Sequence, residues 1–168
     1  TAKAGRGRFS SAPSGEGVLI GNDSSKTYDG TPLEPTGFNP IVLAPGDTVE
    51  VVYGGSQTEA GTGEGTITSY LIRNAAGEDV TANYPTVNVE PGTLRVDPMQ
   101  VVITVADASK VAGAADPAFT GALSQQLVSP DDLGVVTYVR TGTDEAVGVY
   151  ADALTAEFTA NPNYAVQV

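Results

Sequence analysis

The chain has 168 residues, of which 20 are acidic and 8 are basic, so its formal net charge is −12 at pH 7. It contains no cysteine, histidine or tryptophan. Disulfide frameworks, thiolate nucleophiles, cysteine-based zinc sites and histidine-based catalytic triads are therefore excluded. The negative charge also disfavours binding to nucleic acid and to anionic membrane surfaces.

Residues 1–16 are small and polar, with Phe9 as the one large apolar side chain. They are predicted to form a linker or the end of a preceding unit. No apolar run reaches the roughly 18 residues that a membrane span needs, and no signal peptide is recognisable. Because the chain begins with Thr1 rather than Met, it is interpreted as a piece of a longer protein.

From Gly17 onward, short runs rich in Val, Ile, Thr and Tyr alternate with turn residues, which is typical of strands joined by turns. The runs predicted to form strands are 18–20, 48–53, 66–73, 86–89, 93–96, 101–106, 135–140, 147–150, 154–159 and 164–168. Several alternate apolar and polar residues with period two. Val49, Val51 and Tyr53, for example, are expected to face a core from one side of their strand.

One segment has a helical pattern. In residues 122–128, Leu123 and Leu127 stand four positions apart, ahead of Pro130. This pattern allows a helix of two turns at most. The chain is therefore predicted to be all-β, with mostly antiparallel strands.

An internal repeat is the most informative feature of the sequence. Three segments recur in the same order: 23–26 as 107–110, 57–61 as 144–148, and 83–89 as 163–168. Segments that recur in order and at similar spacing indicate two copies of one module of about 80 residues.

The repeat predicts two tandem modules, residues 17–97 and 98–168. Pro98 fixes its own backbone and restricts Asp97, so the junction is short and stiff and the modules are expected to form a rod. The second copy ends before a counterpart of residues 91–96, which predicts that it lacks its last strand. Each module is expected to be a small β-sandwich, Ig-like or β-grasp-like.

Four motifs of the first copy resemble those of repeat domains in large bacterial surface proteins. They are KTYDGT at 26–31, GSQTEAG at 55–61, GEDVTANY at 77–84 and GTLRV at 92–96. The second copy resembles the related MBG type at residues 108–119, 148–150 and 163–164, with Ala112 where that type usually has tyrosine. The chain therefore resembles the YDG/MBG-type repeat domains of bacterial cell-surface, adhesin-like proteins over about residues 17–168.

The resemblance implies an extracellular, cell-wall-associated location and a non-catalytic spacer function in a secreted or wall-anchored protein. It supplies no catalytic residues, and we expect no enzyme activity, no cofactor and no metal. The expected partners are neighbouring repeats of the same parent protein, with neither nucleic acid nor membrane insertion, and the chain is expected to be a monomer. Two alternatives stay open: a module that binds host glycan or protein directly, and an accessory domain of an extracellular carbohydrate-active enzyme.

Four residues are candidates for a covalent cross-link. Lys26 and Lys110 occupy matching positions in the two copies, and so do Asn83 and Asn163. A Lys–Asn isopeptide bond, as in other Gram-positive surface domains, would need each pair buried together beside an acid. The alternative is that the lysines are solvated and the asparagines make local turn hydrogen bonds.

Two further sets of residues have structural interpretations. Asp29, Asp116 and the pair 131–132 carry oxygens that Ca²⁺ could use, but their spacing matches no known calcium loop and favours turns. Tyr84 and Tyr164 recur at one repeat position, which indicates packing in a core or at a corner.

Overall fold

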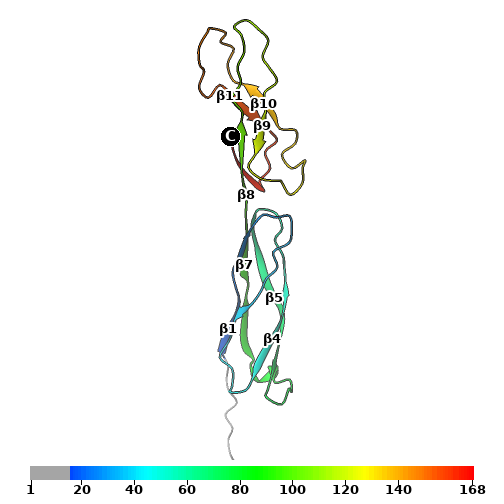
Figure 1. The fold of residues 1–168 in the computed structure, drawn as a ribbon. Coiled ribbons are helices and arrows are strands. Elements are labelled where there is room, and N and C mark those ends of the chain that lie inside the picture. Colours follow the sequence, from blue (N-terminus) through cyan, green and yellow to red (C-terminus); the bar gives the residue numbers. More distant parts are fainter. Residues whose placement is uncertain (1–15) are drawn as a thin grey trace, which may run out of the picture. The chain divides into compact units, whose positions relative to one another are not determined.

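The computed structural model describes residues 16–168, which are nearly all β-strand and turn (Figure 1). Within these residues the one helical element is a 3-10 turn, η1, at Thr81–Asn83. The all-β prediction is confirmed, and antiparallel strand pairs predominate. The linker predicted at 1–16 lies outside the described residues, except that Glu16 is the first residue of β1.

The chain divides into two compact units. Unit 1 comprises the chain up to Ser25, residues 33–57 and residues 62–95. Unit 2 comprises residues 26–32, 58–61 and 96–168. The module boundaries that the repeat suggests stay a prediction.

The strands of the first copy form two sheets. β1 (Glu16–Gly21) lies between β3 (Phe38–Asn39), to which it is antiparallel, and β6 (Thr86–Glu90), to which it is parallel. The second sheet has the strand order β2 (Ser24–Thr27), β7 (Gly92–Asp97), β5 (Gly61–Arg73) and β4 (Thr48–Gly54).

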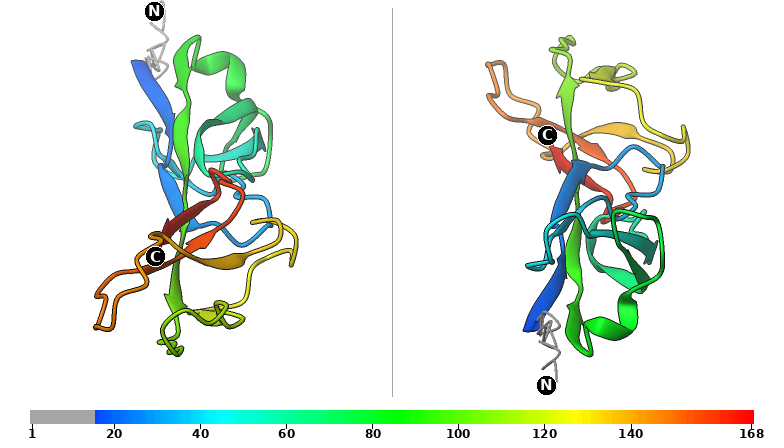
Figure 2. Two further views of the ribbon diagram at one scale, coloured as in Figure 1. Left: turned by 90° about the horizontal axis from the view of Figure 1, so that it is seen from above. Right: turned by 90° about the horizontal axis from the view of Figure 1, so that it is seen from below.

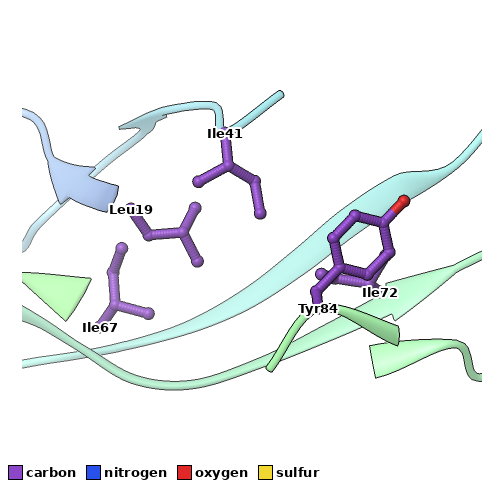
Figure 3. Close-up of a cluster of buried hydrophobic side chains, with 5 residues drawn as sticks. All are labelled: Leu19, Ile41, Ile67, Ile72 and Tyr84. Atoms are coloured by element: carbon purple, nitrogen blue, oxygen red, sulfur yellow. The ribbon is translucent and has the colours of Figure 1, made fainter. Parts of the chain in front are cut away.

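Four aliphatic side chains and one tyrosine form the core of unit 1 (Figure 3). Its members are Leu19, Ile41, Ile67, Ile72 and Tyr84. The alternation predicted for β4 is confirmed, because Val49, Val51 and Tyr53 pack against this cluster while Val52 is exposed. Pattern and packing therefore agree in the strand with the clearest period-two signal.

Unit 2 is built around β8 (Met99–Val105). This strand pairs in parallel with β12 (Tyr164–Gln167) and antiparallel with β9 (Gly121–Leu123). β10 (Thr137–Arg140) and β11 (Leu154–Glu157) form a separate antiparallel pair. The apolar face predicted for 101–106 is confirmed, since Val101 and Ile103 are buried.

Two of the sequence predictions are wrong. Residues 122–128 form no helix: 121–123 are β9, in register with β8 through Leu123 and Ile103. A two-turn helix is marginal by itself, and the ladder with β8 supplies its backbone with better partners. Residues 147–150 form no strand: 147 and 148 are a bend, and 149 and 150 are irregular.

The two copies share one strand pairing. In each, the strand that opens the copy runs parallel to the strand that follows the Asn-Tyr dipeptide: β1 with β6, and β8 with β12. The turn before that strand is also the same, because the tyrosine N–H donates to the carbonyl three residues back, at 3.0 Å in both Tyr84 and Tyr164. The recurrent Asn-Tyr dipeptide therefore marks the start of an equivalent strand in each copy.

Leu19→Ala tests the core of unit 1. Leu19 is completely buried, so removing its side-chain carbons should lower the free energy of unfolding by about 2–5 kcal/mol. Val42, which is 84% exposed, is the control: Val42→Ala should change it by less than about 0.5 kcal/mol. Urea denaturation measures both, and equal effects would contradict this core assignment.

Candidate functional site

In unit 1 a buried tyrosine hydroxyl closes a turn. Tyr84 donates to Asp47 Oδ2 at 2.6 Å and accepts from the backbone N–H of Ala44 at 2.9 Å. The N–H of Asp47 donates to the Ala44 carbonyl at 3.0 Å, so that one hydroxyl serves both ends of the turn. The hydrogen bond to Asp47, together with burial, raises the pKa of Tyr84.

Unit 2 repeats this arrangement at Tyr164. Its hydroxyl donates to Asp132 Oδ2 and accepts from the N–H of Val128 at 2.9 Å. Asp132 in turn accepts from the N–H of Ser129 at 3.0 Å. Burial and the Asp132 carboxylate raise the pKa of Tyr164 to about 12. The corner packing predicted for both tyrosines is confirmed.

The Asn-Tyr strand end of unit 2 also binds residues 26–32 and 58–61, which belong to the same unit. Asn163 is buried; its Oδ1 accepts from the N–H of Ala60 at 2.7 Å, and its Nδ2 donates to the Glu59 carboxylate. The Tyr164 ring meets Tyr28 edge-on, with ring centroids 5.6 Å apart. Asn163 and Tyr164 thus form a binding point for loop segments.

Lys26 organises the turn within residues 26–32. Its Nζ donates to Asp29 Oδ1 at 2.6 Å and to Thr31 Oγ1 at 2.7 Å. Asp29 also accepts from the Thr31 N–H at 2.9 Å, and these bonds lower the pKa of Asp29 to about 2. Gly30 has a φ of 77°, in the left-handed region that favours glycine. The KTYDGT motif is therefore a turn that its own lysine holds.

Lys110, the counterpart of Lys26, belongs to an ionic cluster in unit 2. Its Nζ lies 2.7 Å from both Asp116 and Glu145. Arg140 contacts the same two carboxylates, with Nη2 2.8 Å from Glu145 and Nε 3.2 Å from Asp116. The two cations lower the pKa of Glu145 to about 2. The cluster ties the end of β10 to the loops 107–119 and 141–153.

The same two loops surround an open hollow of about 820 Å³. The loops project from the strands of unit 2 (Figure 1, Figure 2). Charged residues of the cluster line it together with aliphatic side chains. Three valines in these loops are largely in solvent: Val111 is 78%, Val147 93% and Val149 99% exposed. Apolar side chains gathered on loops in this way mark a surface that a partner could cover.

Three of the four cross-link candidates have separate partners. Lys26 binds Asp29 and Thr31, Lys110 binds Asp116 and Glu145, and Asn163 binds Ala60 and Glu59. Asn83 is exposed at the end of η1. The isopeptide bond stays a prediction.

Three of the four aspartates that could offer Ca²⁺ ligands contact protein donors: Asp29 binds Lys26, Asp116 lies in the ionic cluster, and Asp132 binds Tyr164. Among residues 16–168, no three acidic side chains gather in a group that could hold a metal ion. In the same residues, no helix is long and apolar enough to cross a membrane.

Sequence reasoning missed the carboxylates that complete these sites. Asp47 and Asp132 each follow a proline-containing turn, at 45–47 and 130–132, and this shared pattern was the available signal. Glu59 and Glu145 lie in the loosely matching segments 57–61 and 144–148. Their partners are distant in sequence, so spacing alone could not reveal the pairs.

Comparison with protein families gives a match in the second copy. Residues 101–168 match the family model of the MBG domain (YGX type). The resemblance to MBG-type repeats is thus confirmed, and the MBG domain is a non-catalytic repeat family typical of surface proteins. Comparisons with curated proteins and with solved structures gave no significant match. The matched residues contain the Tyr164 corner, the ionic cluster and the exposed valines.

Tyr164→Phe should lower the free energy of unfolding by about 1–3 kcal/mol, because it removes two part-buried hydrogen bonds of the hydroxyl, the one to the Asp132 carboxylate and the one from the Val128 N–H. The ordinary pKa of tyrosine is 10.0, and in the folded chain it is about 12. The hydroxyl's contribution is therefore fully present below pH 10 and is lost as pH rises to about 12. The stability difference between wild type and variant, measured by urea denaturation, should shrink over that range. A constant difference would contradict the assignment.

Glu145 should titrate near pH 2, well below its ordinary value of 4.5. Its ionised form therefore stabilises the fold above pH 4.5, and this contribution is lost as pH falls toward 2. Lys110→Met removes the leading cause and should move the midpoint upward, as measured by carboxyl carbon NMR. Lys26→Met is the matched control: it should leave Glu145 unchanged and raise the midpoint of Asp29. Movement of both carboxyls in either variant would refute two independent clusters.

Proposed function

We propose that this chain is a non-catalytic spacer segment of a secreted or wall-anchored bacterial surface protein, which transmits tension between the parts it joins. The observation that carries the proposal is the parallel pairing of the first and last strands of the second copy, β8 and β12. Their register runs from Met99 opposite Tyr164 to Val102 opposite Gln167.

This pairing has a mechanical consequence. The chain enters the second copy at the start of β8 and leaves at the end of β12, so a pull along it acts on opposite ends of two neighbouring parallel strands. Parallel ladder bonds are evenly spaced, and all of them are loaded together rather than one after another. Such shear resists separation better than peeling the same strands apart from one end.

The polar side chains support a structural role. Lys26 and Asp29 hold one turn, and Lys110, Arg140 and Glu145 hold two loops to the end of β10. Tyr84 and Tyr164 likewise use their hydroxyls in internal hydrogen bonds to aspartates. This use fits a segment that must keep its fold outside the cell without disulfides.

The extracellular location is supported by the family. MBG domains are typical of surface proteins, and residues 101–168 match that family. Neighbouring repeats of the same parent protein would then be the natural partners. The absence of cysteine fits a bacterial export route in which disulfides do not staple small domains.

One observation favours the adhesin alternative, in which the chain binds a host glycan or protein directly. The exposed Val111, Val147 and Val149 form the kind of apolar surface that such binding would use. The valines lie beside the cations of the ionic cluster, and both line or border one hollow. A binder and a spacer place different demands on β8 and β12, so the mechanical test below separates them.

Two pulling geometries test the spacer function. The chain has no cysteine, so handles attach only where cysteine is introduced. Gln100→Cys with Gln167→Cys loads β8 and β12 in shear, and Thr104→Cys with Gln167→Cys peels them from one end. Single-molecule pulling should give a rupture force several times higher in the first geometry. All three positions are exposed, so urea denaturation should show the stability of both variants within about 0.5 kcal/mol of wild type. Equal forces in the two geometries would contradict the proposal.

A further inference from the structure

The internal repeat predicts a binding function for the exposed loops of unit 2. In unit 2, residues 26–32 and 58–61 bind the Asn163-Tyr164 strand end. Their counterparts in the second copy are residues 110–116 and 144–148. These counterparts lie in the two loops around the hollow, which we call the loop end. The loop end is thus the second-copy counterpart of residues 26–32 and 58–61 of the first copy, which bind the Asn163-Tyr164 strand end.

The matching residues are of the same type. When the two segments are aligned on their shared Glu-Ala pair, which leaves Val147 as an extra residue, Glu145 and Ala146 correspond to Glu59 and Ala60, which bind the amide of Asn163. Val147 follows them directly and is 93% exposed, and Val149 is 99% exposed. The Glu145 carboxylate is exposed beside Lys110 and Arg140, and the Ala146 N–H makes one long hydrogen bond, of 3.2 Å, to Asp144 Oδ1. The loop end therefore carries a carboxylate, a weakly held backbone N–H and uncovered apolar surface.

Unit 1 carries a second Asn-Tyr strand end. Tyr84 makes the same turn bond as Tyr164, at the same 3.0 Å, and it has the same hydroxyl contacts with an aspartate and a backbone N–H. Asn83, the counterpart of Asn163, is exposed, and among the described residues its side-chain amide makes no hydrogen bond. This strand end presents the donor and acceptor that the loop end could use.

We propose that the loop end of one chain binds the Asn83 strand end of a second copy of this chain, head to tail. Glu145 would accept from the Asn83 amide, and the N–H of Ala146 would exchange its bond to Asp144 for the amide oxygen of Asn83. Val147 and Val149 would cover the apolar surface beside it. The proposal rests on the proposed function, because it names the partner through which one repeat segment would continue into the next. A head-to-tail contact uses two different surfaces and can therefore extend to further copies.

The contact should be weak between separate chains. Ala112 stands where the first copy has Tyr28, so the edge-on contact with the tyrosine ring is missing. Each chain carries a net charge of −12, so two copies repel one another. Added salt screens this repulsion, and association should become stronger rather than weaker as ionic strength rises. In a tandem arrangement the effective concentration is of millimolar order, which makes a weak contact sufficient.

A complementation experiment by NMR tests the proposal. The full ¹⁵N-labelled wild-type chain, concentrated to about 1 mM in high salt, should show shifts at residues 107–119 and 141–153 and also around Asn83. Val147→Asp with Val149→Asp should abolish both sets of shifts, and so should Asn83→Asp, which places a charge opposite Glu145. Val135→Asp is the control; Val135 is 84% exposed and lies outside both loops, so this variant should behave as wild type.

Mixing the two defective variants gives the decisive result. When the valine double variant is labelled and the Asn83 variant is not, shifts should return only around Asn83, because each chain keeps one intact surface. No concentration-dependent shift at about 1 mM would overturn the proposal. Shifts confined to the loops would also overturn it, since they would mean that the loops pair with one another. Neither outcome affects the pulling experiment, which depends on β8 and β12 within one chain.

Discussion

The buried tyrosine hydroxyl at the start of β6 and β12 is the contact on which the rest of each unit depends. A phenol can donate one hydrogen bond and accept others, and both tyrosines use this capacity fully. The aspartate and the backbone N–H that each tyrosine binds lie 32–40 residues before it in the sequence. One side chain thereby fixes a distant turn against the strand that pairs in parallel with the opening strand of its copy.

Parallel pairing makes this contact necessary. Two neighbouring parallel strands cannot be joined by a tight hairpin, so a long stretch of chain must leave the first strand and return to the start of the second. In unit 1 that stretch contains the turn at Asp47, and in unit 2 it contains the turn at Asp132. The tyrosine fixes the position of the returning chain along the opening strand, so that the hydrogen bonds between the two parallel strands form in one register.

The lysines act on the loops in a comparable way. Lys26 satisfies the acceptors of its own turn, whereas Lys110 works with Arg140 on carboxylates from two loops. Exposed ion pairs contribute little stability individually, but a cluster of four charges restricts the loops that carry them. The exposed valines are consequently presented on restrained loops, which lowers the entropic cost of covering them.

Much of the fold could be predicted from the sequence, because the signals involved are local. Period-two patterns located β4 and β8, and the recurrence of Asn-Tyr located the starts of equivalent strands in the two copies. The same recurrence predicted the corner role of Tyr84 and Tyr164, and the motifs of the second copy indicated the MBG family. The sequence by itself thus determined the all-β class, the repeat and the buried tyrosines.

Only the tertiary structure decided which segments and side chains pair with one another within the chain. Leu123 and Leu127 have helical spacing, but β8 lies beside this segment and its ladder outweighs a marginal helix. Val147 and Val149 alternate like strand residues, yet they lie in an irregular loop and are almost fully exposed. Asp132 and Tyr164 are 32 residues apart, and Lys110 and Glu145 are 35 apart. A sequence pattern reports the preference of a segment, whereas hydrogen bonds and ion pairs depend on which distant segment the fold brings alongside it.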